Sequence, residues 1–564
     1  MKKTIFYRFA SLTLVVITAF SLLTGCTPAK DTASSDLSTK VSKDSTVDAS
    51  YEETKEIGLP IVNEPITLTY WCPLDSKYSA TIKSMNELPM SEELEKRTGI
   101  HIEFKHPVAG QEEQQLNLMM ASDTMPDIIE TNWTSKSGGP SKAIADGIII
   151  DMTDLIDQYA PNYKALLSQY PNALKEVTTS DNKQYMMTSF TTDDAIKIMV
   201  GPQIRTDWLN KLGLEPPKTL EDWYRVLTAF KEQDPNGNGK ADEIPFTSAG
   251  YKTNESLTSN LNIFAWAYGI STDFYMIDNT VKYGPLEPEF KEFLTLMNQW
   301  YQEGLIDPDF ITTDKKMFDS KVTTGIAGSW SAGLMGDMGK YLQYFEAEKP
   351  DWSIGATTFP MLEENGTRYN FNTNMNSIAG MAGCSITSTN KYAVETTKWF
   401  DYAYSEEGHL LYNFGIEGLT YELVNGEPQF TDLITNNENK WDVTTALGHY
   451  CRGVVSNGAH MPDIRVFDLR AGRPEQMAAK KEIWKDATYE RVLPPVKPSE
   501  ENSQRAADIM TDIYTYVNES VSKFIIGTDS IDGNYDKFIT NLKNMGIEEA
   551  IGLKQTALDE FNAK

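Results

Sequence analysis

The stretch ITLTYWCPL (residues 66–74) alternates apolar with polar side chains and is rich in β-branched residues, a pattern that predicts a strand. MSEELEKRTGI (90–100) follows with the spacing of an amphipathic helix, and HIEFKHP (101–107) predicts a second strand. A second helix, QEEQQLNLMMASDT, leads to a third strand, PDIIETNW (126–133). This β-α-β-α-β order predicts an α/β fold with a parallel sheet and helical crossovers.

Two tryptophans lie at the carboxyl ends of these strands, where sheets of this kind bind ligands. Trp133 lies in a polar loop, ETNWTSKSGG, which favours contact with a ligand over a place in the core. For Trp71 the two interpretations are balanced. Both residues are therefore candidate ligand-binding residues.

The chain has 564 residues, too many for one hydrophobic core. A second body is expected to begin near residue 200, where RTDWLNKLGLEPPKTLEDWYRVLTAFKEQDP predicts two helices around a Pro-rich turn. Thr219 and Asp222 have the spacing of a capping box at the second of these helices. The C-terminal part is expected to be largely helical. The formal net charge of -29 argues against a nucleic-acid partner, which needs a basic face.

The first residues, MKKTIFYRFASLTLVVITAFSLLTGC, predict a secretory signal peptide over 1–25. The segment ends Leu-Thr-Gly-Cys, which resembles a bacterial lipobox and predicts lipidation of Cys26. The alternative is ordinary cleavage beside an incidental cysteine. Residues 26–60 are polar with almost no large apolar side chain, so we expect a disordered tether between a lipid anchor and a globular body.

Three further cysteines, Cys72, Cys384 and Cys451, have spacings that match no metal motif. We expect them to be small buried hydrophobic residues. A Cys384–Cys451 disulfide remains open at this point.

The segment DPNGNGKADEIP (234–245) has the ligand spacing of an EF-hand calcium loop. Oxygen ligands fall at the required odd positions, with Gly239 at the sharp turn, but Pro245 occupies the last position in place of Glu. Glu243 is the nearby replacement for that acid. A solvated turn is the alternative, since Asn and Gly favour turns on their own. We expect a structural Ca²⁺ ion held by Asp234, Asn236, Asn238, the carbonyl of Lys240, Asp242 and Glu243.

Four segments together carry a resemblance to a known family: DWLNKLGLEPPKTLEDWYRVLTAF, DPNGNGKADEIP, LMNQWYQEGLIDPDF and YSEEGHLLYNFGIEG. From about residue 62 onward the chain resembles the extracellular solute-binding proteins (family 1 type) of bacterial carbohydrate ABC importers. It is most similar to the large lipoprotein branch that includes calcium-containing alginate-oligosaccharide-binding proteins. In that branch the calcium ligands match the residues of the 234–243 loop.

The resemblance implies a two-lobe periplasmic-binding-protein-like fold (type II-like), with a hinge and a ligand cleft between the lobes. By analogy lobe one holds 62–195 and 365–415, and lobe two holds 200–360 and 420–564.

The resemblance also implies that aromatic rings in the cleft stack on sugar rings. Trp330, in GSWSAG, resembles a recurring ligand-contacting aromatic of the second lobe and is the strongest candidate. Trp133 matches a first-lobe loop that contacts sugar in relatives. Trp266 and Tyr268 match a segment that faces the cleft, although a place in the core fits them nearly as well.

We therefore expect a non-enzymatic, monomeric lipoprotein on the outer face of a cell membrane. It would capture an oligosaccharide and deliver it to the transmembrane subunits of an ABC permease. The rival from another class is a lipid-anchored glycosidase or lyase, but no catalytic carboxylate pair can be chosen among 80 acidic residues. A binder of a non-sugar solute such as a peptide, and a sensor or adhesin with the same fold, are further alternatives. The sequence does not name the sugar.

Overall fold

The computed structural model describes residues 58–74, 82–122, 124–249, 261–454 and 458–564. The predicted signal peptide, Cys26 and nearly all of the tether lie outside these residues, so those assignments stay predictions. Within the described part of the chain, no helix is both long and apolar enough to cross a membrane.

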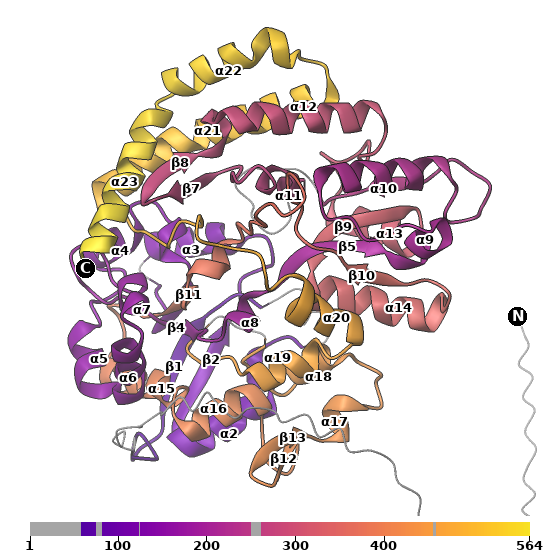
Figure 1. Ribbon diagram of the computed structural model, residues 1–564. Coiled ribbons are helices and arrows are strands. Elements are labelled where there is room, and N and C mark those ends of the chain that lie inside the picture. The colour runs from indigo at the N-terminus through magenta and orange to yellow at the C-terminus, as the bar shows by residue number, and fades with distance from the viewer. Residues whose placement is uncertain (1–57, 75–81, 123, 250–260, 455–457) are drawn as a thin grey trace, which may run out of the picture. The chain divides into compact units, whose positions relative to one another are not determined.

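The first lobe is built on a five-stranded sheet of order β2-β1-β3-β11-β4 (Figure 1). Its strands are β1 (Ile66–Trp71), β2 (Ile100–Lys105), β3 (Ile128–Thr131), β4 (Met187–Phe190) and β11 (Ala379–Ile386). Strand β1 runs parallel to β2 and β3, as the sequence pattern predicted. Strand β11 returns from late in the chain and pairs antiparallel with β3 and β4.

Helices cover this sheet, and local sequence explains where several begin and end. A proline occupies the first turn of four of them, where no hydrogen-bonded N–H is needed. Gly99 ends the first crossover helix in the left-handed conformation, with φ of 76°. The helices are α2 (Pro89–Thr98), α3 (Glu112–Ala121), α4 (Gly139–Ala145), α5 (Thr153–Tyr159), α6 (Pro161–Gln169), α7 (Pro171–Glu176), α15 (Ala393–Tyr402) and α16 (Glu406–Phe414).

The second lobe contains a four-stranded sheet of order β10-β5-β9-β6. These strands are β5 (Val200–Arg205), β6 (Ile244–Phe246), β9 (Ala327–Gly333) and β10 (Ile354–Ala356). Strand β9 pairs antiparallel with β5 and parallel with β6. A separate hairpin joins β7 (Phe274–Ile277) to β8 (Thr280–Tyr283).

Long helices complete the second lobe, and in Figure 1 α12 and the C-terminal helices lie together along one side of it. Thr219 Oγ1 accepts from the Asp222 N–H at 3.1 Å and the Asp222 carboxylate accepts from the Thr219 N–H at 3.2 Å, which confirms the capping box. The helices are α9 (Thr206–Leu212), α10 (Leu220–Glu232), α11 (Asn262–Trp266), α12 (Pro288–Gln302), α13 (Lys315–Thr323), α14 (Lys340–Glu348), α21 (Glu500–Ile526), α22 (Ile531–Asn544) and α23 (Ile547–Ala563).

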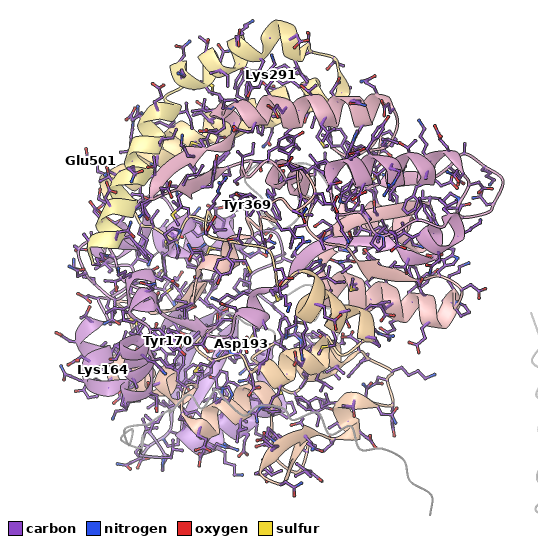
Figure 2. All side chains as sticks on the ribbon, viewed as in Figure 1. Lys164, Tyr170, Asp193, Lys291, Tyr369 and Glu501 are labelled. Atoms are coloured by element: carbon purple, nitrogen blue, oxygen red, sulfur yellow. The ribbon has the colours of Figure 1, made fainter. Side chains whose placement is uncertain are left out.

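The chain crosses between the lobes more than once. The first crossing, 191–199, contains α8 (Asp194–Lys197), and its N-cap Asp193 accepts from the Ala195 N–H at 2.8 Å. A return segment ends at β11. Figure 2 labels Asp193 on the first crossing and Tyr369 on the return. The remaining elements are β12 (Tyr421–Val424), β13 (Glu427–Phe430), α17 (Asp432–Thr435), α18 (Val443–Gly448), α19 (Ile464–Arg470) and α20 (Pro474–Ala478).

One segment expected in the second lobe packs on the first. Arg452 donates to the buried Glu130 carboxylate on β3 at 3.2 Å, and the Phe190 N–H donates to the His460 carbonyl at 2.9 Å. A buried carboxylate needs a cationic partner, and this one comes from far along the chain. Arg452 and His460, which were expected in the second lobe, therefore contact the first.

The three described cysteines are buried free thiols, as expected for small core residues. Burial raises the pKa of Cys384 to about 12, so this thiol is protonated at neutral pH. The Cys384–Cys451 disulfide that the sequence left open is not formed in this structure.

Candidate functional site

A cavity of about 440 Å³ lies where the two lobes and the first crossing meet. Ile196 and Phe467 in its wall belong to the second-lobe core, whereas Glu130 and His460 belong to the first lobe. The volume is in the range of small-molecule sites in proteins. The wall is formed by Pro73, Glu130, Ser189, Ile196, Met199, Asn413, Gly453, Val454, His460, Pro462, Asp463, Val466, Phe467 and Arg470.

Asp463 is the most strongly held acid of this wall. Arg465 donates to it through Nε and NH2, the latter at 2.7 Å, and His409 Nε2 lies 2.9 Å from Oδ2. Burial alone would raise the pKa of the Asp463 carboxyl, but the bonds from His409 and Arg465 outweigh it and hold the pKa well below its usual range. Asp463 is therefore a fixed, ionised acceptor.

Glu130 is the second acid of the wall and is 3% exposed. It accepts from the Tyr70 hydroxyl at 2.8 Å and from Arg452 at 3.2 Å. The Arg452 guanidinium lies 4.5 Å from the Tyr70 ring centroid, a cation–π contact. Gly458 is required beside them, because a Cβ there would come within 2.9 Å of both the Tyr70 hydroxyl and the Arg452 guanidinium.

Two further polar residues of the wall have their hydrogen bonds fixed internally. Asn413 donates to the Met461 carbonyl at 2.7 Å and accepts from the Asp463 N–H at 3.0 Å. His460 Nδ1 lies 2.9 Å from the Gly458 carbonyl, which places the proton on Nδ1. Burial, with the Arg452 charge adding to it, lowers the pKa of His460 to about 4, so the ring is neutral at physiological pH.

The rest of the wall is apolar. Phe467, Val466, Met199, Ile196 and Pro462 give it carbon surface beside the acids and the imidazole. Apolar walls with a few fixed polar groups are the usual composition of a site for a small organic ligand.

Trp330, the strongest sequence candidate, does not line this cavity. It is fully buried on β9, its Nε1 donates to Gln203 Oε1 at 3.0 Å, and its ring packs edge-on against Phe318 and Tyr341. Strand β9 is covered on both faces, so the side chain fills the second-lobe core. In this structure no face of the ring is open to a sugar, and its role as a stacking residue stays a prediction.

The other aromatic candidates are also absent from the cavity wall. Trp133 is 1% exposed and donates from Nε1 to Ser385 Oγ at 2.8 Å, which ties the loop after β3 to β11. Trp266 packs in the second-lobe core against Phe359.

Trp71 and Tyr268 are placed elsewhere. Trp71 lines a separate groove between β1 and α3. Tyr268 is partly buried against the second-lobe core, and burial raises its pKa to about 12. The five rings are thus not brought together in one site.

The polar wall residues were not predicted from the sequence. His409 and Asn413 lie in YSEEGHLLYNFGIEG, a segment noted for its resemblance to the family, but nothing in it pointed to Asp463. Glu130, Asn413 and Asp463 are far apart along the chain, and only the fold brings them together.

The 234–243 loop is a tight turn organised around the Asp234 carboxylate. The Asp234 carboxylate accepts from the N–H groups of Gly237, Asn238 and Gly239 at 2.9, 3.1 and 3.0 Å. Gly239 has φ of 74°, as the sharp turn requires. The Lys240 side chain is exposed, and its backbone N–H donates to Asn238 Oδ1 at 2.8 Å.

Glu243 is the acid of this loop whose carboxylate oxygens lack hydrogen-bond partners. Both of its carboxylate oxygens are buried without a hydrogen-bond partner. Burial raises its pKa, and the charges of Asp234 and Asp242 add to the effect. A buried carboxylate beside two others is unfavourable unless a cation joins them.

Asn236 and Asn238 complete the loop. Their amide nitrogens donate to the Asp242 carboxylate at 3.0 Å. Rotation of each amide would put Oδ1 in place of Nδ2 and turn both donors into ligands. Within the described ranges, no three His, Cys, Asp or Glu side chains form a metal cluster by themselves, so a cation here would depend on these amide oxygens as well.

Comparison with known proteins gives consistent results. Residues 82–409 match the family described as bacterial extracellular solute-binding protein. The chain is 26% identical over 518 residues to the fructooligosaccharide ABC transporter substrate-binding protein FusA of Streptococcus pneumoniae, covering 85% of this chain and 88% of that protein. It is 27% identical over 499 residues to lipoprotein LipO of Bacillus subtilis, covering 86% and 89%.

Solved structures show the same fold. The alginate-binding protein AlgQ2 without calcium ion aligns with a TM-score of 0.69 at 24% identity, over 88% of this chain and 99% of that one. FusA in complex with kestose aligns with a TM-score of 0.69 at 23% identity, over 88% and 100%. The expected two-lobe α/β fold is confirmed. The family match covers more than half of the chain. Proteins of this family bind solutes and do not transform them, so the alternative of a glycosidase or lyase is removed. The chain belongs to the bacterial extracellular solute-binding proteins.

Proposed function

We propose that this protein is the substrate-binding component of an ABC importer and captures an oligosaccharide between its two lobes. The observation that carries the proposal is the cavity where the lobes meet, in which fixed polar groups alternate with carbon surface. Sugars need both, because their hydroxyl groups require hydrogen-bond partners when buried while their C–H faces favour apolar contact.

Relatives support the sugar class. FusA is described as a fructooligosaccharide-binding transporter component, and its structure was solved with kestose. YtcQ of Bacillus subtilis, 26% identical over 245 residues, is described as a polygalacturonan/rhamnogalacturonan-binding protein. These relatives bind neutral and acidic sugars respectively, so family membership alone does not choose between the two.

A structural calcium ion in the 234–243 loop forms the second part of the proposal. The two orphaned oxygens of Glu243 and the carboxylates of Asp234 and Asp242 fit a hard cation, with Asn236, Asn238 and the Lys240 carbonyl as further ligands. The ion would pin the end of α10 to the start of β6. Solved relatives include AlgQ2 without calcium ion and an EF-hand mutant of FusA, which supports the assignment.

Lipidation at Cys26 and delivery to membrane permease subunits complete the proposed role. The lipobox and the polar tether over 26–60 motivate the anchor. LipO, a relative of similar length, is described as a lipoprotein. The protein would then act as a monomer on the outer face of the cell membrane.

The proposal is tested by measuring binding directly. The mature chain, purified with Cys26→Ser in 1 mM Ca²⁺, would be titrated calorimetrically with a panel of neutral and acidic oligosaccharides. Saturable binding of at least one oligosaccharide, with the sugar recovered intact after hours, is the expected result. Binding of short peptides, with no oligosaccharide bound, would refute the sugar assignment.

A further inference from the structure

The cavity between the lobes is lined by more acidic than basic groups. Among the described residues of its wall, the two carboxylates of Glu130 and Asp463 face one guanidinium, that of Arg470. The imidazole of His460 adds no charge, because burial lowers its pKa to about 4. A ligand that brings further carboxylates into this space would meet acceptors where it needs donors.

The cations behind these carboxylates are already engaged. Arg465 holds Asp463 and reaches Glu427 on β13 at 2.6 Å. Arg452 is 3% exposed, bonded to Glu130 and packed on the Tyr70 ring. Neither guanidinium can turn to a ligand carboxylate without breaking its ion pair with a buried acid of the wall, which is costly.

Arg470, the cation in the wall itself, is partly engaged as well. Its Nε donates to Thr444 Oγ1 at 3.1 Å. One guanidinium can pair with one carboxylate in a bidentate manner, but an oligomer of uronic acids carries a carboxylate on every unit. The described wall therefore offers fewer cations than such an oligomer would require.

The wall suits hydroxyl groups instead. A sugar hydroxyl donates to a carboxylate and can accept from a guanidinium, so Glu130, Asp463 and Arg470 can all be matched by a neutral sugar. The charge of the whole chain acts in the same direction, because a formal net charge of -29 disfavours the approach of polyanions.

We propose that this cavity selects neutral oligosaccharides and rejects oligosaccharides of uronic acids. The inference rests on the proposed function, since it narrows the class of sugar bound at the same site. It also separates this chain from relatives described as binding alginate or polygalacturonan.

The test compares two forms of one sugar that differ in charge but hardly in shape. The neutral oligosaccharide that binds best in the panel is oxidised at its primary hydroxyls to the uronate, and part of this product is converted to the uronamide. Calorimetric titration of the C26S chain should give an affinity for the uronate at least tenfold below that for the uronamide at 20 mM salt. The difference should shrink at 500 mM salt, as charges are screened.

Each outcome has a distinct meaning. The inference would be overturned if the uronate bound as tightly as the uronamide or more tightly, or if only acidic oligosaccharides of the panel bound. Either result would leave the proposed function intact. Failure of every oligosaccharide to bind would overturn the proposed function, and the inference with it.

A variant gives a second readout. Glu130→Gln removes the carboxylate that pairs with the Arg452 guanidinium, so the positive charge of Arg452 is no longer balanced. The ratio of uronamide affinity to uronate affinity should therefore fall at least threefold. Glu422→Gln on the exposed hairpin changes the net charge equally but not the cavity, and should leave the preference unchanged. Equal preferences in the two variants would contradict the role of the wall acids.

Discussion

Removal of calcium provides a quantitative test of the 234–243 loop. If the ion binds with Kd of ~10 μM, 1 mM Ca²⁺ stabilises the folded chain by about 2.7 kcal/mol. Unfolding of roughly 500 residues as one unit carries an entropy of about 1 kcal/mol/K, so EDTA should lower Tm by about 3 °C. If the second lobe unfolds separately, as roughly 200 residues, the shift grows to about 6 °C.

Glu243→Gln separates a metal ligand from a simple turn. With calcium present the variant should melt below the wild type, because one charged ligand is lost. In EDTA it should melt at the same temperature or above, because the substituted amide brings no charge next to Asp234 and Asp242. Glu364→Gln, at an exposed turn of the same lobe, is the matched control and should respond to calcium like the wild type.

Differential scanning calorimetry with and without EDTA measures all of these differences. Equal melting temperatures for the wild type in calcium and in EDTA would refute the metal assignment. A calcium response in Glu243→Gln as large as that of the wild type would refute the role given to Glu243.

Two further predictions concern residues that the structure describes, and a third concerns Cys26, which lies outside them. Trp330→Phe should leave oligosaccharide affinity within twofold of that of the wild type. The variant loses the hydrogen bond to Gln203, so denaturant titration should show a loss of about 1–3 kcal/mol in the free energy of unfolding. A tenfold loss of affinity would instead indicate that Trp330 contacts the ligand. The lowered pKa of Asp463 in the folded state means that its contribution to stability is complete above the ordinary Asp pKa of ~4 and is lost as pH falls below it. Arg465→Gln should therefore flatten the fall of Tm between pH 5 and pH 2, and an unchanged slope would count against the network. Cys26→Ser should release the protein from the membrane fraction into the medium, as shown by immunoblotting of both fractions, and retention on cells would argue against the lipid anchor.

Local patterns in the sequence predicted local structure well. The alternation of 66–74 and the Thr219–Asp222 capping box are each decided by a few neighbouring residues, and the structure confirms them. The calcium loop is similar in kind, because all of its proposed ligands lie within ten residues and their spacing can be read directly.

Features set by long-range packing could not be predicted in this way. Strand β9 is buried on both faces, so alternation gave no sign that Trp330 belongs to the core. The pairing of Arg452 with Glu130, 322 residues apart, attaches Arg452 to the first lobe. The wall of the cavity likewise depends on residues from β3, α16 and α19 that no spacing rule connects.

The central claim is that an oligosaccharide binds between the lobes, and calorimetric titration of the mature C26S chain in calcium tests it most directly. We expect saturable binding of a neutral oligosaccharide with a stoichiometry of one. Phe467→Ala in the cavity wall should weaken this binding at least tenfold, and Leu118→Ala in the groove beside α3 should leave it unchanged. Binding that is insensitive to Phe467→Ala in a folded variant would place the ligand elsewhere and contradict binding between the lobes.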